Sequence, residues 1–231
     1  MKLITCIFSC LFLTGSSVFL CQSKYSDIYD KEFNQAIEFY NNNKKQFNKT
    51  ATKVKLNSEF VFSIVAPEIS QYSSVFNQVE LYSLKVLYTQ FGKDYSDFSV
   101  GYFQMKPSFV ESLENYISDN PKQFKEYKDL LFKEPQLKES RIKRLERLNS
   151  IAWQLKYLAA FCAVVENRFN SKTYRSVEEK LKFYAAAYNS GYHKSNEQLT
   201  NMLKKTFFPK NANRRFNYSD ISILFYKKIK K

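Results

Sequence analysis

The chain of 231 residues carries a formal net charge of +14 and contains one histidine, His193. Hydrophobic residues make up 44% of the sequence, which supplies a sizeable buried core and excludes an intrinsically disordered protein. One histidine and no metal-ligand spacing argue against a zinc site or a histidine-dependent nucleophilic triad, so we predict no metal and no cofactor. The positive charge favours a polyanionic partner such as nucleic acid, anionic lipid or an acidic cell-wall polymer.

Residues 1–22 have the pattern of a secretory signal peptide. Lys2 is followed by an apolar run over 3–13, and charged sequence begins only after a group of small residues. A retained membrane anchor is the competing interpretation. Cys21 would allow a lipoprotein anchor, although Leu20 before it is bulkier than the small residue that such cleavage sites usually carry. We therefore predict a periplasmic or secreted protein of the cell envelope.

Residues 23–55 are polar, with apolar residues at loosely helical intervals. This pattern predicts an N-terminal extension made of a short helix and a flexible connection rich in asparagine and lysine. The main domain is predicted over 56–203. In its first part, apolar residues at three- and four-residue steps predict a helix over 75–91 that ends at Gly92.

Further helices are predicted along the main domain. A polar helix is expected near 108–118, and a long helical pattern covers 138–169, charged in its first half and apolar nearly all round in its second. Another helix is expected from about Val177 to Gly191. Because no segment shows sustained alternation of apolar and polar residues, we predict an all-α domain.

The C-terminal segment 204–231 is basic and aromatic. Its apolar residues Ile221, Leu224, Phe225 and Ile229 have helical spacing, which predicts a helix that packs on the domain. A peripheral membrane contact through the basic residues of this segment is the alternative.

Glu68 is the first candidate catalytic residue, because it follows the apolar run FVFSIVAP at 60–67. It has a structural interpretation as an exposed residue in the first turn of a helix that begins at Pro67. The functional interpretation is a carboxyl group set against apolar neighbours. Such surroundings raise its pKa, so that it stays protonated near neutral pH and can act as a general acid.

The stretch GYFQMKP at 101–107 is the second candidate, and it contains one of only four glycines in the chain. It has a structural interpretation as a turn that enters a helix. In the functional interpretation, Gly101 lets a sugar approach the backbone closely, and the Gln104 amide bonds a hydroxyl or N-acetyl group.

The stretch AAYNSG at 186–191 is the third candidate. It has a structural interpretation as a helix end with Gly191 as its cap and Tyr188 as a buried ring. In the functional interpretation, the Tyr188 hydroxyl holds the catalytic carboxyl group or the sugar.

These three motifs, in this order, resemble the lysozyme-like superfamily, and in particular soluble lytic transglycosylases and goose-type lysozymes. The resemblance covers roughly residues 56–195, and the wider pattern from APEISQY to DFSVGYFQMKPSF also resembles a divergent Bacteroidetes group of secreted proteins. It implies a lysozyme-like helical domain with Glu68 as the catalytic residue at the end of an apolar helix. The residues implied to bind substrate are Gly101, Tyr102, Gln104, Met105, Tyr188, Asn189 and Gly191.

The chain departs from the family pattern at two points. Ile69 stands where the family usually has serine, and the interval from Glu68 to Gln104 is longer than in typical transglycosylases. Glu80 is closer to the usual spacing but lacks the apolar residues before it, so it is the alternative acid.

The resemblance implies a secreted enzyme that cleaves the MurNAc–GlcNAc β-1,4 bond of peptidoglycan with one glutamate as general acid and base. A hydrolytic muramidase would also need a carboxylate to position water, for which Asp94 and Asp97 are the candidates; both also suit turn and capping roles. The pattern does not decide between the two reactions. A non-catalytic cell-wall-binding or envelope scaffold on the same fold is the alternative, and nucleic-acid binding is supported by the charge alone.

Overall fold

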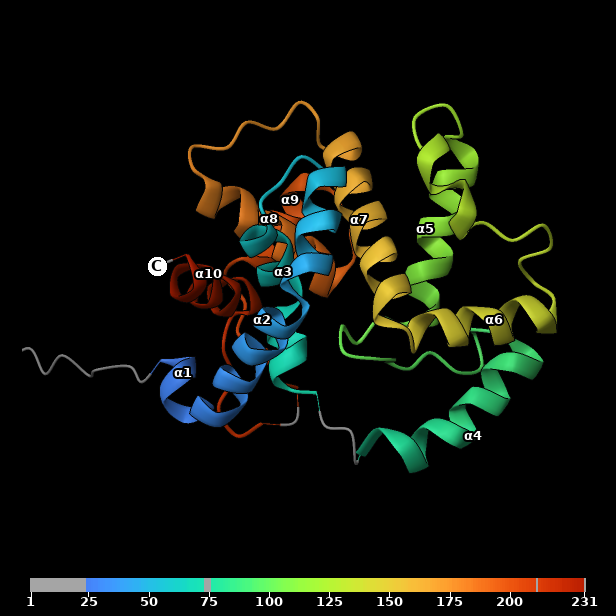
Figure 1. Ribbon diagram of the computed structural model, residues 1–231, viewed down its shortest axis with the longest axis horizontal. Helices are drawn as coiled ribbons and strands as arrows, with labels where there is room; N and C mark the ends of the chain where they lie inside the picture. Colours follow the sequence, from blue (N-terminus) through green and yellow to red (C-terminus); the bar gives the residue numbers. More distant parts are fainter. Residues whose placement is uncertain (1–23, 73–75, 211, 231) are drawn as a thin grey trace, which may run out of the picture.

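The computed structural model describes residues 24–72, 76–210 and 212–230, with the backbone alone at 76–81. The described part is built of helices, with isolated antiparallel bridges at Val100–Met105 and Phe208–Phe216 (Figure 1). This confirms the all-α prediction. The helices are α1 (Tyr25–Ile28), α2 (Asp30–Lys53), α3 (Ser58–Ser70), α4 (Phe76–Phe91), α5 (Pro107–Asp119), the 3₁₀ helix η1 (Lys125–Leu130), α6 (Lys138–Leu148), α7 (Ile151–Arg168), α8 (Val177–Ser190), α9 (Asn196–Met202) and α10 (Tyr218–Ile229).

Helix α3 lies at the centre of the molecule, in contact with α2, α8 and α10. Nearly all of its side chains are buried, in agreement with its apolar sequence. Its first turn is capped by Asn57, whose side chain accepts a hydrogen bond of 2.7 Å from the backbone N–H of Phe60. Because α3 is enclosed by other helices along its length, a polar group near its end is held rigidly against the core.

Helix α2 is continuous, so the flexible connection predicted within residues 23–55 is wrong. Apolar side chains at helical spacing, among them Phe33, Tyr40 and Phe47, bury one face of α2. Phe33 stacks on Phe225 of α10, with ring centroids 4.2 Å apart. The run of asparagine and lysine over 41–45 lies mostly on the exposed face of the same helix. Tertiary packing of the apolar face therefore outweighs the weak helix propensity of the asparagines.

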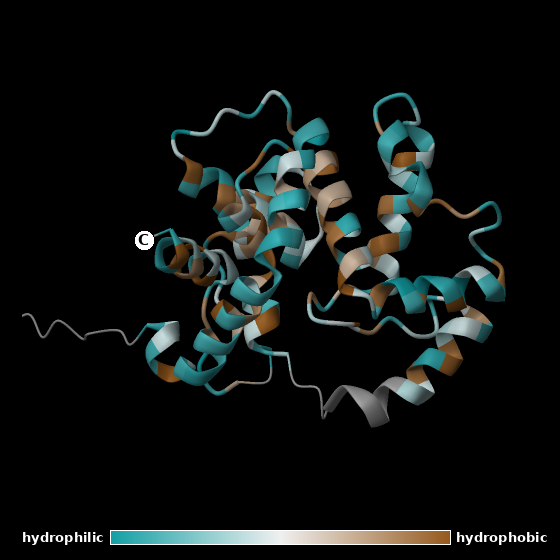
Figure 2. Ribbon diagram, in the orientation of Figure 1, coloured by the Kyte–Doolittle hydropathy of each residue, from teal (hydrophilic) through white to brown (hydrophobic). Residues whose placement is uncertain are grey.

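The long helical pattern predicted over 138–169 forms two helices, α6 and α7, bent by 97° relative to each other. The break lies at Asn149 and Ser150, where the Asn149 side-chain amide donates a 3.0 Å hydrogen bond to the Leu145 carbonyl at the end of α6. Figure 2 shows the change from the mostly hydrophilic α6 to the more hydrophobic α7. Within the described residues, no single helix has the length and apolar character needed to cross a membrane, whereas the bent α6–α7 pair meets these criteria by length and composition.

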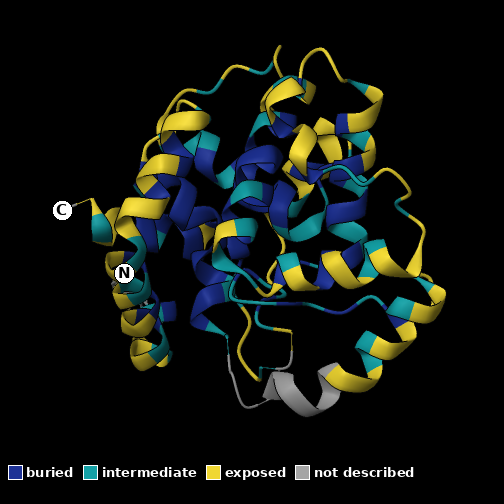
Figure 3. Cartoon of the chain, turned by 45° about the vertical axis from the view of Figure 1, so that its right-hand side comes forward, coloured by how far each residue is buried: buried dark blue, intermediate teal, exposed yellow. Residues whose placement is uncertain are grey.

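The helices form two groups that meet at α7 (Figure 1). Helices α2, α3, α8 and α10 pack together on one side, and α4, α5 and α6 lie on the other. Helix α10 buries Ile221, Ile223 and Phe225 against α3 and α8, while Lys227 and Lys228 are exposed. Buried residues are concentrated in the interior of the helix assembly, and the outer faces are exposed (Figure 3).

Candidate functional site

A cleft of about 690 Å³ lies at the end of α3. Its walls come from four segments far apart in the sequence: the end of α3, the loop and helix start over 97–112, the end of α8 with the residues after it, and the segment over 208–210. The lining residues are Glu68, Gln71, Asp97, Ser99, Gln104, Met105, Lys106, Ser108, Phe109, Ser112, Tyr188, Asn189, Ser190, Gly191, Tyr192, His193, Phe208, Pro209 and Lys210. The tertiary structure thus brings residues of all three sequence motifs into one cleft.

Glu68 lies in the last turn of α3, with Pro67 inside the helix, so the interpretation as a first-turn residue is wrong. Its side chain is half-buried and lines the cleft. Within the described part of the chain, its carboxyl group has no hydrogen-bond or ion-pair partner. Burial raises the pKa of Glu68 to about 8, and the charge of Lys210 partly opposes this shift. The carboxyl end of a helix carries partial negative charge, which also disfavours the ionised form. Glu68 is therefore mostly protonated at neutral pH.

Gly101 begins a tight turn closed by two backbone hydrogen bonds between Val100 and Met105, of 2.9 and 3.1 Å. Its φ of +70° favours glycine, and an added Cβ would lie 2.2 Å from the Gln154 side-chain nitrogen and 2.5 Å from the Leu148 carbonyl oxygen. The close approach that requires glycine is thus made by Gln154 of α7 and not by a sugar. Gly101 is not among the residues that line the cleft.

Gln104 lines the cleft from the same turn and has a positive φ of 48°, which is uncommon for a residue with a side chain. Its side-chain NH₂ group donates a 2.8 Å hydrogen bond to the Gly101 carbonyl. The side-chain oxygen therefore remains available to accept a hydrogen bond from a ligand. Met105 is buried in the cleft wall. Tyr102 does not line the cleft and packs between Phe39 and Tyr72, with ring centroids 4.6 and 4.4 Å away. Its predicted contact with substrate is thus replaced by a contact within the protein.

Tyr188 lines the cleft beside Glu68 but does not donate to it. Its hydroxyl group donates a 2.6 Å hydrogen bond to the Phe103 carbonyl, in the centre of the turn that holds Gln104. Burial, and then the nearby Glu68, raise the pKa of Tyr188 well above its ordinary value, so it remains a neutral donor. The hydrogen bond predicted from Tyr188 to the acid is thus replaced by a hydrogen bond that fixes the turn to α8. The remaining predicted residues of this motif, Asn189 and Gly191, both line the cleft.

Asp97 lines the cleft, but its carboxylate group is engaged at the start of α5. It accepts hydrogen bonds of 2.9 Å from the Ser108 backbone N–H and 2.8 Å from the Ser108 hydroxyl, and Lys106 lies 3.4 Å away. This arrangement suits the capping role that the sequence also allowed. Asp94 is exposed and lies outside the cleft lining. The geometry therefore gives little support for a role of Asp94 or Asp97 in positioning water.

The alternative acid, Glu80, lies in α4, and its side chain is outside the described residues. Helix α4 packs against α6, in the other helix group. No α4 residue whose side chain the structure describes lines the cleft. The cleft geometry therefore involves Glu68 and gives no support to Glu80.

The sequence pattern gives no signal for the cleft residues that follow α9. Phe208 and Lys210 belong to a segment that appears only basic and aromatic in the sequence, and His193 lies just after the third motif. Phe208 and Lys210 reach the cleft because the chain returns to α3 before α10 begins, whereas His193 lies between α8 and α9. Only this long-range return, which has no local sequence signature, brings Phe208 and Lys210 to the cleft.

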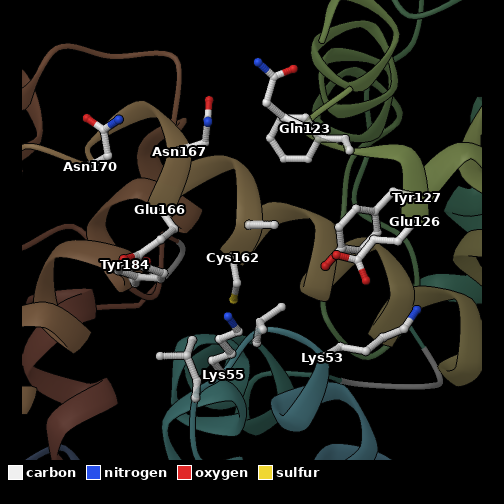
Figure 4. A pocket seen from close by; sticks show the side chains of 14 residues that line it. Lys53, Lys55, Gln123, Glu126, Tyr127, Cys162, Glu166, Asn167, Asn170 and Tyr184 are labelled. Atoms are coloured by element: carbon white, nitrogen blue, oxygen red, sulfur yellow. Dashed lines mark hydrogen bonds between the residues drawn. The ribbon is translucent and has the colours of Figure 1, made fainter. Parts of the chain in front are cut away.

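A second, smaller hollow of about 360 Å³ lies between the end of α2, η1, α7 and α8 (Figure 4). Cys162 lies at its centre in the view of Figure 4, and burial raises the pKa of its thiol group far above the usual range. Glu166 accepts a hydrogen bond from Tyr184 and lies 2.8 Å from Lys180, so its carboxylate is paired within the protein. Glu126, the other acid among the described residues that line the hollow, is exposed, whereas the unpartnered Glu68 of the cleft is half-buried.

No group of three or more potential metal ligands of the histidine, cysteine or acidic type occurs among the described residues. The cleft can therefore offer a neutral carboxyl group, amide and hydroxyl groups, and lysine side chains to a ligand. Comparison of the chain with protein-family models, with curated proteins and with solved structures finds no match.

Proposed function

We propose that the protein is a peptidoglycan-cleaving enzyme on a lysozyme-like fold, with Glu68 as its single general acid and base. The observation that carries this proposal is the Glu68 carboxyl group, which lines a cleft without a partner among the described residues and has a pKa raised to about 8. A group that is protonated at neutral pH and open to a cleft can donate its proton to a leaving oxygen. The motif resemblance supplies the substrate class, the MurNAc–GlcNAc β-1,4 bond.

The proposed reaction begins when protonated Glu68 donates its proton to the glycosidic oxygen while the bond from that oxygen to C1 breaks. The leaving sugar departs as an alcohol, and positive charge develops at C1. The Glu68 carboxylate then accepts a proton from the attacking hydroxyl group as the new bond to C1 forms. If the attacker is the C6 hydroxyl of the same sugar, the product is a 1,6-anhydro sugar; if it is water, the product is a reducing end.

The carboxyl groups of the cleft favour the transglycosylase variant. Among the described residues that line it, Glu68 and Asp97 are the carboxylates, and Asp97 is engaged by Ser108 and Lys106. A reaction that closes on the substrate's own hydroxyl group needs no second carboxylate to position water. One free acid in the cleft therefore suits an intramolecular attack better than hydrolysis.

Sugar recognition is assigned to the polar groups around the acid. The Gln104 amide oxygen, Asn189 and the Ser112 hydroxyl line the cleft and suit hydroxyl or N-acetyl groups. Lys106 and Lys210 give the cleft positive charge, which complements acidic wall polymers. The proposed location is the cell envelope, reached through the signal peptide predicted at 1–22, which lies outside the described residues.

The test is to digest purified peptidoglycan with the natural protein, with Glu68→Gln and with Glu146→Gln as a matched control. Glu146 is an exposed glutamate of α6 that does not line the cleft. Muropeptides are identified by mass spectrometry. We expect 1,6-anhydro products from the natural protein and from Glu146→Gln, and a loss of at least about 100-fold in Glu68→Gln.

The other outcomes separate the alternatives. Reducing-end products that disappear in Glu68→Gln would assign a muramidase. Activity that survives in Glu68→Gln would contradict the role of this acid and direct attention to Glu80. A protein that binds the wall but releases no product over a range of pH and wall sources would be the non-catalytic scaffold that the departure at Ile69 also allows.

A further inference from the structure

We propose that Lys210 is the cationic partner of Glu68 in catalysis, stabilising the carboxylate that forms when Glu68 gives up its proton. This inference rests on the proposed function and adds to it a charged residue that acts through Glu68. Lys210 lines the same cleft as Glu68 but comes from the segment between α9 and α10, beyond the three motifs.

The segment that carries Lys210 is tied to the helix that carries Glu68. Phe208 and Phe216 exchange two backbone hydrogen bonds, of 3.1 and 2.7 Å, and the Phe208 ring packs edge-on against Tyr218 with centroids 5.0 Å apart. The Tyr218 hydroxyl donates a 3.0 Å hydrogen bond to the Ile64 carbonyl, one helical turn before Glu68 on α3. The neighbours of Lys210 in the chain are thus tied to the helix that carries the acid, and Lys210 and Glu68 line the same cleft.

The base of this segment is also fixed. The Asn217 side-chain amide donates hydrogen bonds of 3.1 Å to the Met202 carbonyl and 2.7 Å to the Lys205 carbonyl, while its oxygen caps α10 by accepting from Ser219 and Asp220. These contacts hold the start of α10 beside the end of α9, so the two ends of the segment that carries Lys210 lie together.

The other charged or titratable groups that face the cleft are already committed. Lys106 lies 3.4 Å from the Asp97 carboxylate. Tyr188 donates to the Phe103 carbonyl and Tyr192 to the Ser112 hydroxyl, and both remain neutral because burial raises their pKa values. Tyr218 is buried outside the cleft lining, donates to the Ile64 carbonyl and likewise stays neutral because burial raises its pKa. Partial burial, with Lys194 and Arg168 nearby, lowers the pKa of His193 and favours its neutral form.

Lys210, in contrast, is exposed and makes no ion pair or hydrogen bond within the described part of the chain. It is also the one group whose charge opposes the effect of burial on Glu68. Of the described groups that line the cleft, it alone is an uncommitted cation. Because Lys210 lines the cleft and has no other partner among the described residues, we assign it as the cation that acts on the Glu68 carboxyl group.

The chemistry explains why an exposed cation would be useful here. Before the reaction Glu68 is neutral and needs no counterion. Proton donation to the glycosidic oxygen leaves a half-buried carboxylate with no hydrogen-bond donor among the described residues, and such a charge is costly. An ammonium group at the cleft wall offsets that cost while charge develops in the transition state. A cation in direct contact would ionise the acid beforehand, so a more distant, solvated one suits a group that must start protonated.

The test compares Lys210→Met and Lys210→Arg with Lys204→Met, which removes an exposed lysine of the same segment that does not line the cleft. Two quantities are measured: the pH profile of muropeptide release, and the titration of the Glu68 carboxyl carbon by NMR, assigned from its absence in Glu68→Gln. In Lys210→Met we expect kcat to fall about tenfold and the Glu68 titration to move to higher pH. Lys210→Arg and Lys204→Met should behave as the natural protein does.

An unchanged Glu68 titration together with an unchanged rate in Lys210→Met would overturn the inference, since the cation would then not act on the acid. A natural protein that cleaves no wall would instead overturn the proposed function and the catalytic part of this inference. In that case the titration still decides whether Lys210 and Glu68 interact. Equal changes of rate and titration in Lys210→Met and Lys204→Met would also contradict the inference, because the loss of one positive charge anywhere in the segment would then explain them.

Discussion

Two parts of the molecule contain buried or half-buried carboxyl groups, which have several partners in one part and none among the described residues in the other. Between α4, α5, α6 and α7 lies a charge cluster made of Tyr88, Glu111, Glu114, Arg144 and Tyr157, all buried. Arg144 lies 2.6 Å from Glu114 and 3.3 Å from Glu111. Tyr157 and Tyr88 each donate a 2.7 Å hydrogen bond, to Glu114 and Glu111 respectively. Every carboxyl group in the charge cluster has partners.

In the cleft, by contrast, Glu68 has none among the described residues. Burial raises the pKa of Glu114 as well, but hydrogen bonds from Arg144 and Tyr157 oppose that shift. For Glu68 only the charge of Lys210 opposes it. Burial therefore does not distinguish Glu68 from Glu114; the presence or absence of hydrogen-bond partners does. The charge cluster joins helices because its acids are satisfied, whereas the Glu68 carboxyl group keeps its proton because it is not.

The largest expected effect follows from removing the cation of the charge cluster. Arg144→Met leaves Glu114 buried without its only ion-pair partner among the described residues and removes one of the two cations beside Glu111, the other being Lys93. We expect the free energy of unfolding to fall by about 3–5 kcal/mol. Urea denaturation measures this change. The matched control is Arg175→Met, which removes an exposed arginine paired with Glu179 and should leave the urea midpoint unchanged. An equal shift in both variants would show that the charge cluster contributes no more than a surface pair.

A smaller effect is expected at Gly101, whose turn links the cleft to α7, one of the helices around the charge cluster. The turn accepts a hydrogen bond from Tyr188 of the cleft at the Phe103 carbonyl, and its Phe103 N–H donates to Gln154 of α7. We expect Gly101→Ala to cost about 3 kcal/mol, since the added Cβ is strained at positive φ and collides with Gln154. It should also reduce any wall-cleaving activity, because Gln104 would move with the turn.

Gly92→Ala is the control for this prediction. Gly92 also has a positive φ, of 91°, but an added Cβ would lie 3.8 Å from its nearest neighbour, in Arg141. We expect only the backbone strain, about 1 kcal/mol. Thermal or urea unfolding of both variants measures the difference. Equal losses would contradict the conclusion that packing against Gln154 accounts for the glycine at position 101.

The smallest expected effect is the pH dependence of stability that Glu68 contributes. Its pKa is raised in the folded protein to about 8 from an ordinary value of 4.5, so the folded state binds more protons between these values than the unfolded state does. The natural protein should therefore lose stability as pH rises through this window, by about 1–2 kcal/mol after allowance for partial exposure of the side chain.

Glu68→Gln should remove this contribution, and Glu146→Gln should retain it. Urea midpoints measured at intervals from pH 5 to pH 9 give the comparison. If the curve of Glu68→Gln ran parallel to that of the natural protein, the carboxyl group would not be protonated at neutral pH. The proposed general acid would then lack its physical basis.

The sequence determined the features that depend on local periodicity and local backbone chemistry. Apolar spacing predicted the all-α class and the helices near α4, α5, α8 and α10, and Gly191 ends α8 as its position indicates. The order of the three motifs predicted which residues to examine, and Glu68, Gln104 and Tyr188 all line one cleft. These features could be predicted because each depends on residues within a few positions of one another.

Which residues contact each other was decided only by the tertiary structure. It assigned the Tyr188 hydroxyl to Phe103, the space beside Gly101 to Gln154, and the cleft position to Lys210. It also paired Arg144 with Glu114, two residues that look like ordinary polar positions on amphipathic helices. Such partners lie tens of residues apart in the chain, and their pairing depends on how whole helices pack. Whether a carboxyl group is left unpartnered, and hence protonated at neutral pH, is therefore a property of the fold that no short stretch of sequence carries.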